Sequence, residues 1–278
     1  MTSLRMQTTE RSTLFPDLGQ RTLLMGILNV TPDSFSDGGR YCDVHRAVAH
    51  ALEMQEQGAD VIDVGAESTR PQAKPLSLDD EWSRLEPILD KLSQAVSVPL
   101  SIDTYKAEIA RRAMACGVEV VNDVWGGTFD PAMNSVVAKS GAVYVIMHNG
   151  FGGPEVRGDI VAHVSQALVR QVEQAVAEGV DRARIWLDPG IGFGKTMRQN
   201  LDLVNRVSEI RALGYPVLIG TSRKSFIGNV LDLPVEERLE GTAASVAIAI
   251  TRGADMVRVH DVLPIRRVAR MVDATVRI

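Results

Sequence analysis

The sequence is poor in cysteine and carries no excess of positive charge. Only two of its 278 residues are cysteines, Cys42 and Cys116, and they lie far apart without a paired motif. This spacing argues against a disulfide framework and against a thiolate metal site. A formal net charge of -5 and a pI near 5.6 give no overall attraction for nucleic acid or for an acidic membrane. An anionic ligand would therefore need a local cluster of basic residues.

The N-terminal region lacks a long hydrophobic run. The first twenty residues contain Arg5, Glu10, Arg11 and Asp17 and no sustained apolar stretch. They show neither a secretory signal nor a membrane-spanning helix, so we expect a cytoplasmic protein with no membrane partner. Because the first strongly periodic segment starts only after residue 20, we expect residues 1–20 to form an irregular N-terminal extension. Residues 21–278 would then form one domain.

Hydrophobic residues are abundant, at 45% of the chain, and they alternate regularly between short apolar runs and helical patterns. The runs typical of buried strands are residues 23–30, 60–65, 98–103, 118–123, 142–148, 183–188, 216–221 and 255–260. Helical spacing occurs at residues 44–57, 78–94, 107–116, 160–178, 200–213, 242–250 and 262–275. Eight strands alternating with helices in a chain of this length predict a (β/α)8 TIM barrel, with a doubly wound sheet as the alternative. No linker divides the chain, which favours one barrel domain.

Polar residues stand at or just after the ends of the predicted strands. They are Asn29, Asp63, Glu67, Asp103, Asn122, Asp123, His148, Asp188, Ser222, Arg223, Lys224, Arg258 and His260. Each one alone could serve a structural purpose, but a barrel brings all these strand ends to one rim, where active sites form. Carboxylates, amides and cations together at one rim suit a polar heterocycle that carries an anionic leaving group.

Two of these strand ends have competing interpretations. The oxygen-rich loop that follows Asn29 suits a cation, a phosphate partner or a polar ligand, but a turn would use the same residues. Arg258 and His260 alternate on the last strand and point to the same side, where they could hold a phosphate. In the alternative, Arg258 pairs with a neighbouring carboxylate and His260 caps the last helix. Lys224 and Ser225 lie in the preceding loop, where a helix start can accept an anion.

Seven motifs occur in order at these strand ends. They are MGILNVTPDSFSDGG at 25–39, GAESTRP at 65–71, and then SIDT, NDV, LDPGIGFGK, SRKSFIG and RVHDV. In these motifs the chain resembles the dihydropteroate synthases of the folate pathway, from about residue 23 to the last helix. The resemblance implies a (β/α)8 barrel that joins p-aminobenzoate to 6-hydroxymethyl-7,8-dihydropterin diphosphate with the help of Mg2+. It also implies a homodimer and a target of sulfonamides.

The resemblance assigns two substrate pockets. The pterin pocket would contain Asp103, Asn122, Met147, Asp188 and Lys224. The aminobenzoate pocket would contain Thr69, Arg70, Pro71, Phe193 and Ser225, with Lys224 between the two pockets. Amide and carboxylate groups suit the pterin edge because that ring presents donors and acceptors in fixed positions.

The diphosphate side of the site is assigned in the same way. Diphosphate would be held by Asn29, Arg70, Arg258 and His260, with Asn29 also facing the metal. Mg2+ keeps much of its water and takes substrate phosphate oxygens, so one amide suffices chemically. The catalytic group would comprise Asp103, Lys224, Arg258 and His260, together with Asp33 and Asp37 from a first loop that closes over the site.

Two features leave room for other interpretations. Ala66 and Gln72 replace glycines that are common in the second motif, which leaves the path of that loop and sulfonamide binding open. A pterin-dependent methyltransferase or a non-catalytic pterin-binding paralogue would share the barrel. A methyltransferase would not need Lys224 and Ser225 beside Arg258 and His260. A non-catalytic paralogue would be expected to have lost a loop or a cation of the site, and this chain has lost neither.

Overall fold

A computed structural model describes residues 14–30, 39–67, 75–153 and 156–277, and of residues 39–42 it describes only the backbone. It contains eight parallel strands in the order β6-β5-β4-β3-β2-β1-β8-β7. Their bounds are β1 Leu23–Asn29, β2 Val61–Gly65, β3 Leu100–Asp103, β4 Val120–Asp123, β5 Val143–Met147, β6 Ile185–Asp188, β7 Leu218–Ile219 and β8 Met256–Val259.

The sheet closes on itself between its two outer strands. A parallel bridge joins Leu187 in β6 to Val217, just before β7. The Leu187 amide also donates to the Pro216 carbonyl at 2.9 Å. Closure confirms the predicted (β/α)8 barrel and excludes the doubly wound sheet, which has open edges.

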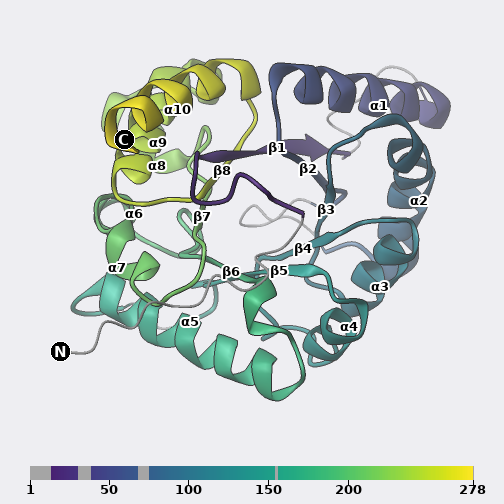
Figure 1. Cartoon of the computed structure of the whole chain (residues 1–278), viewed down its shortest axis with the longest axis horizontal. Helices are drawn as coiled ribbons and strands as arrows, with labels where there is room; N and C mark the ends of the chain where they lie inside the picture. Colours follow the sequence, from purple (N-terminus) through teal and green to yellow (C-terminus); the bar gives the residue numbers. More distant parts are fainter. Residues whose placement is uncertain (1–13, 31–38, 68–74, 154–155, 278) are drawn as a thin grey trace.

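The helices form an outer ring around the strands (Figure 1). Their bounds are α1 Gly39–Gln57, α2 Leu78–Ala95, α3 Ala107–Ala115, α4 Met133–Ser140, α5 Ile160–Ala177, α6 Met197–Asn205, α7 Val207–Arg211, α8 Ser225–Leu231, α9 Leu239–Thr251 and α10 Val262–Val276. Short 3-10 turns occupy Arg182–Arg184 and Val235–Glu237. None of the described helices is long and apolar enough to cross a membrane.

Local sequence signals fix several helix starts. Ser77 caps α2 by accepting from the Asp80 amide, and acidic residues fill the first turn. Asp159 caps α5, and Thr196 with Gln199 forms a capping box at α6. These caps satisfy amide groups that the helix itself leaves unpaired.

Three elements differ from the sequence prediction. Helix α4 was not predicted, because its eight residues, MNSVVAKS, mix polar and β-branched types that favour helix only weakly. The helix predicted for residues 200–213 is divided at Arg206 into α6 and α7. Strand β7 has only two residues, because it pairs with β8 only at Leu218 and Ile219, and its pairing with β6 is the single Leu187–Val217 bridge.

The barrel interior is filled by side chains from alternate strand positions. This inner cluster includes Leu23, Met25, Val61, Val120, Val143, Val145, Trp186, Leu218 and Met256. Phe15 joins it and meets the Trp186 ring edge to face, at a centroid distance of 5.5 Å. Residues 14–20 of the predicted extension contain turns and no helix, and Phe15 anchors this segment in the core. A buried aromatic pair gives this segment enough apolar contact to order it.

The register brings the strand ends level with one another. Asp103 in β3 pairs with Asn122 in β4, and Met147 in β5 pairs with Asp188 in β6. Asn29 at the end of β1 pairs with Gly65 at the end of β2. The polar residues predicted for the rim therefore lie at one mouth of the barrel.

Candidate active site

A charged cluster joins three strands at the mouth of the barrel. The Arg258 guanidinium donates through Nε to Asp63 Oδ2 and through Nη2 to Asp103 Oδ2, both at 2.6 Å. The Asn122 Nδ2 atom donates to the same Asp63 oxygen at 2.9 Å. One arginine thus links β2, β3 and β8. It pairs with neighbouring carboxylates, as the second interpretation of Arg258 predicted.

Asp63 is a member of this cluster to which the sequence assigned no role. Its side chain is fully buried, with 0% exposed, and it contacts both Arg258 and Asn122. It holds these two side chains through Oδ2, and its other oxygen, Oδ1, is buried without a partner among the described residues. Its place at the end of β2, beside the second motif, was the available signal.

The electrostatics of Asp103 are unusual. Burial raises the pKa of Asp103 to about 7, although the charge of Arg258 opposes this and that of Asp63 adds to it. The second oxygen, Oδ1, is buried and finds no hydrogen-bond partner among the described residues. Asp103 therefore keeps one acceptor for a ligand at the barrel mouth.

Lys224 reaches toward the same mouth from the loop after β7. Its Nζ lies 4.9 Å from the centroid of the Phe193 ring and donates to the Ile191 carbonyl. Burial lowers the pKa of Lys224 to about 8, with the charge of Asp188 opposing. A Cβ atom at Gly192 would lie 2.9 Å from Lys224 Cδ, so the glycine leaves room for the lysine stem.

Asp188 faces Lys224 from the end of β6. Its carboxylate is buried and accepts from the Gly190 amide at 2.7 Å. Burial raises the pKa of Asp188, and the charge of Lys224 opposes this increase. Buried carboxylates and amides with fixed partners, next to two cations, form a site for a polar ring with an anionic substituent.

Comparisons with known proteins agree with this geometry. The model of the family described as pterin binding enzyme matches residues 25–260. The dihydropteroate synthase of Bacillus subtilis is 50% identical over 256 residues, which cover 92% of this chain and 89% of that protein. A crystal structure of dihydropteroate synthase from Clostridium difficile in the presence of pteroic acid superposes with a TM-score of 0.91 at 48% identity, covering 94% of this chain and 99% of that one.

The chain belongs to the dihydropteroate synthase family of pterin-binding enzymes. It is therefore a transferase, as the resemblance implied. A second structure, the Xanthomonas albilineans dihydropteroate synthase with 4-aminobenzoic acid, has a TM-score of 0.88 at 40% identity and covers 92% of this chain and 93% of that one.

In this synthase family member, Lys195 is a further structural residue that the sequence reasoning missed. Its Nζ donates to three backbone carbonyls, those of His148, Gly190 and Phe193, at 3.2, 2.7 and 3.0 Å. Burial lowers the pKa of Lys195 to about 7, with Asp188 opposing. The lysine thereby ties the end of β5 to the loop that carries Phe193. The last letter of the LDPGIGFGK motif was the only signal for it.

The close approach of this loop to β5 requires glycine at position 190. Gly190 has φ +70°, and a Cβ there would fall 2.0 Å from the His148 carbonyl oxygen. No other residue fits without displacing the strand end.

His260 lies beside Ser222 at the end of β8. The backbone amide of His260 donates to Ser222 Oγ at 3.1 Å, and its Nδ1 lies 3.0 Å from the same oxygen. Asp261, and not His260, occupies the N-cap position of α10, so the predicted alternative of a capping histidine is wrong. The serine hydroxyl fixes the orientation of the imidazole ring.

The remaining predicted residues divide into two groups. Asn29 ends β1 with its side chain exposed, and Ser225 is the exposed first residue of α8. Met147 is buried beside Tyr105 and Val124 near the mouth. The other predicted residues lie outside the described part of the chain: Asp33, Asp37, Thr69, Arg70 and Pro71.

The donor set near Asn29 fits a hydrated magnesium ion. Among the described residues no group of three or more His, Cys, Asp or Glu side chains is placed to hold a metal. A single exposed amide oxygen suits an ion that keeps its waters and takes phosphate oxygens, as Mg2+ does. It would not suit a metal that needs a cage of protein ligands.

Proposed function

We propose that this enzyme joins p-aminobenzoate to 6-hydroxymethyl-7,8-dihydropterin diphosphate. The amine nitrogen forms a bond to the exocyclic methylene carbon, the bond from that carbon to the diphosphate oxygen breaks, diphosphate leaves, and the amine gives up one proton to solvent. The observation that carries the proposal is the joining of Asp63, Asp103 and Arg258 beside Lys224 and Asp188 at one barrel mouth. Relatives of the same fold have been solved with 4-aminobenzoic acid and with 7,8-dihydropteroate.

The pterin ring would lie against the buried acceptors of β3, β4 and β6. Asp188 and Asn122 would bond its amino and amide groups, and Met147 would pack on its face. The partnerless oxygen of Asp103 supports this placement, since a buried acceptor is normally satisfied by a donor.

The order of bond breaking is the finer part of the proposal. We infer that the carbon–oxygen bond breaks before the amine attacks, which leaves a cation delocalised into the pterin. The Asp103 carboxylate would stabilise that charge inside a site with little water, where electrostatic effects are large. Arg258 would hold Asp103 in place and neutralise the departing diphosphate, together with His260 and Arg70.

The second substrate would lie between Lys224 and the start of α8. Phe193 would form one wall for the aminobenzoate ring, with Thr69 and Pro71 opposite, and Ser225 would receive the carboxylate. Mg2+ at Asn29 would supply charge neutralisation for the diphosphate. Asp33 and Asp37 would close the site from the first loop and exclude water.

The direct test is to supply purified enzyme with the pterin diphosphate, p-aminobenzoate and Mg2+, and to measure diphosphate release and pteroate formation. We expect both products in equal amounts. Tight pterin binding with no product would contradict the activity and favour a silent paralogue.

The bond order has its own test. In pterin diphosphate labelled with 18O at the bridging oxygen, a bond that breaks first lets the label move to non-bridging positions when aminobenzoate is absent. We expect this exchange in the wild type and slower exchange in Asp103→Asn. Normal turnover with no exchange would favour a concerted displacement.

Two further expectations complete the proposal. We infer a homodimer, on the resemblance to the family, and we keep the cytoplasmic location as an expectation. Measurement of the mass in solution tests the first of these, and a monomer would contradict it.

A further inference from the structure

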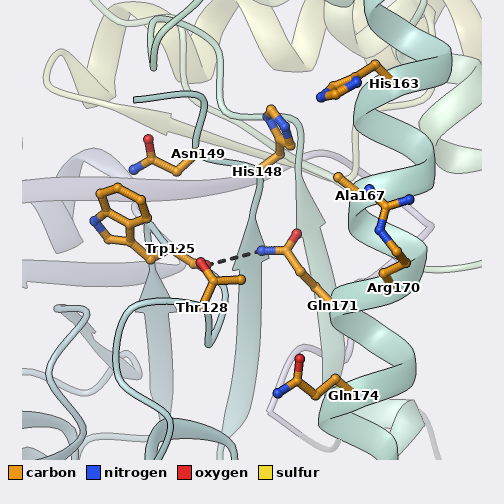
Figure 2. A pocket seen from close by; sticks show the side chains of 9 residues that line it. All are labelled: Trp125, Thr128, His148, Asn149, His163, Ala167, Arg170, Gln171 and Gln174. Atoms are coloured by element: carbon orange, nitrogen blue, oxygen red, sulfur yellow. Dashed lines mark hydrogen bonds between the residues drawn. The ribbon is translucent and has the colours of Figure 1, made fainter. Parts of the chain in front are cut away.

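A cavity opens on the outer side of the barrel, next to the mouth, because Trp125 packs with Met147 and Phe193 and Gln171 Nε2 donates to the Met147 carbonyl at 3.3 Å. It has a volume of about 460 Å3 and lies between the loop after β4, the end of β5 and helix α5 (Figure 2). Its lining comprises Trp125, Thr128, His148, Asn149, His163, Ala167, Arg170, Gln171 and Gln174. None of the side chains assigned to the pterin, aminobenzoate or diphosphate lines it.

Two buried polar atoms of the lining have no hydrogen-bond partner among the described residues. They are His148 Nδ1 and Gln171 Oε1. The His148 residue is only 7% exposed. The other end of the Gln171 amide is satisfied, because Nε2 donates to the Trp125 carbonyl at 3.1 Å, as Figure 2 shows. Since buried polar atoms normally have partners, Gln171 Oε1 calls for a donor, and His148 Nδ1 calls for an acceptor or a donor according to which ring nitrogen carries the proton.

The charge of the lining favours an anion. It includes the exposed cation Arg170 and no aspartate or glutamate. Arg170 makes no ion pair with another described residue, and its charge acts on the His148 ring, so its guanidinium faces the cavity. Burial lowers the pKa of His148 to about 3, and the charge of Lys195 adds to this, so the ring is neutral and one of its nitrogens can donate.

One class of anion satisfies all of these groups. A phosphate monoester has a second pKa near 6, so near neutral pH it offers acceptor oxygens and, in part, a P–OH donor. A carboxylate at that pH has no proton to give to Gln171 Oε1. Arginine pairs well with phosphate oxygens, and the Trp125 ring offers an apolar wall for the organic part.

We propose that this cavity is a second ligand site, which binds a phosphate monoester with a planar organic group. Arg170 and His148 take the phosphate, Gln171 accepts from it, and Trp125 packs against the organic part. The site does not depend on the reaction proposed above, because it shares no side chain with it.

Phenyl phosphate is a suitable probe, and calorimetry on the whole chain measures its binding. We expect it to bind the wild type at least five times more tightly than inorganic phosphate does. Two variants identify the place: Arg170→Gln removes the cation, and Ala167→Phe fills the cavity from the half-buried face of α5. We expect each to weaken binding at least tenfold.

The controls separate this site from the barrel mouth. Arg184→Gln removes a cation from a residue that does not line the cavity, and we expect it to bind phenyl phosphate as the wild type does. Turnover of Arg170→Gln without phenyl phosphate should stay within twofold of the wild type. If both pocket variants bind phenyl phosphate with unchanged affinity, the proposal is overturned, since the probe would then occupy the diphosphate site. If inorganic phosphate binds equally well, the role of Trp125 is overturned.

Discussion

Arg258 and Lys195 are both half-buried cations near the barrel mouth, but they are held by different kinds of partner. Arg258 contacts two carboxylates, those of Asp63 and Asp103, whereas Lys195 contacts three neutral backbone carbonyls. Burial would lower the pKa of Arg258, yet the charges of Asp63 and Asp103 outweigh it and raise that pKa above its usual range. Lys195 has no such bonded partner, and burial lowers its pKa to about 7.

The two sides of the barrel mouth are therefore stabilised by different interactions. On the side of β2, β3 and β8, fixed charges hold one another, so loss of one leaves others unpaired. On the side of β5 and β6, hydrogen bonds from a lysine hold the backbone of a loop. Loss of that lysine leaves neutral carbonyls without a donor. An unpaired carbonyl destabilises the folded state less than an unpaired buried charge does.

The largest effect is expected from removal of Arg258. Arg258→Leu leaves Asp63 and Asp103 buried without their counter-charge. We expect a loss of about 3–5 kcal/mol of stability, as for other buried pairs with one partner removed. Urea unfolding measures this, and turnover should fall by at least about 100-fold.

The double variant Asp63→Asn with Arg258→Leu should regain part of the stability, because one unpaired charge is gone. A single variant as stable as the wild type would show that the charge cluster is not what holds this side.

A second large effect is expected at Lys224, which stands between the two sides. Lys224→Ala should abolish turnover with the fold intact, because the site loses the cation beside Asp188. In the wild type, kcat/KM should fall below pH 7 as Asp103 gains a proton and above pH 8 as Lys224 loses one, following their pKa values of about 7 and about 8.

Lys224→Arg separates these limbs. The guanidinium stays charged throughout, so the decline above pH 8 should disappear while the acid limb stays in place. A pH profile of kcat/KM measures both. An alkaline limb that persists in Lys224→Arg would assign it to another group.

The two sides also differ in how far the sequence could predict them. Polar and charged residues at strand ends were visible as a pattern, because a barrel brings Asp103, Asn122 and Arg258 to one rim. Their partners were not visible, since Asp63 and Asn122 lie 59 positions apart and only the register sets their contact. The resemblance supplied the roles of the two pockets, and the comparisons confirmed the family.

The sequence could not predict the side of the mouth at β5 and β6, where Lys195 binds backbone carbonyls. The three carbonyls bound by Lys195 come from two loops, and no residue type marks a carbonyl as a partner. The Phe15 contact was missed for a similar reason, because an isolated aromatic before the first periodic segment gives no period to detect. Helix α4 was missed because its packing, and not its intrinsic propensity, stabilises it.

A smaller effect than at Arg258 is expected at Lys195. Lys195→Met removes the donor from three carbonyls and should cost about 1–3 kcal/mol. We expect the KM for aminobenzoate to rise more than the KM for the pterin, because the loop carries Phe193. Lys139→Met, at an exposed lysine of α4, is the matched control. Equal increases in both KM values would place the effect on the whole site and not on this loop.

The same lysine gives a pH dependence of stability. Its folded-state pKa of about 7 lies below the ordinary value of 10.5. Between these values the unfolded chain binds more protons than the folded chain, so this lysine makes the free energy of unfolding rise from pH 7 toward pH 10. Lys195→Met should remove that part of the increase. Urea midpoints at pH 7 and pH 9.5, compared with those of Lys139→Met, measure it.

The smallest effect is expected at Ser222, an uncharged residue that orients His260. Ser222→Ala removes the oxygen that accepts from the His260 amide and contacts its Nδ1. The imidazole stays in the site but loses one orienting contact, so we expect kcat/KM to fall about 2–10-fold, the scale of one neutral hydrogen bond. The loss should appear in the KM for the pterin diphosphate, because His260 is assigned to the diphosphate.

Ser245→Ala is the control for this variant. Ser245 is also buried and donates to Thr221, directly before Ser222 in the chain, but it does not contact His260. If both variants change the KM for the pterin diphosphate equally, the effect comes from general packing behind β7. If only Ser222→Ala changes this KM, and the KM for aminobenzoate is unchanged, then His260 binds the diphosphate. The hydrogen bond from Ser222 would then contribute to the affinity for that leaving group.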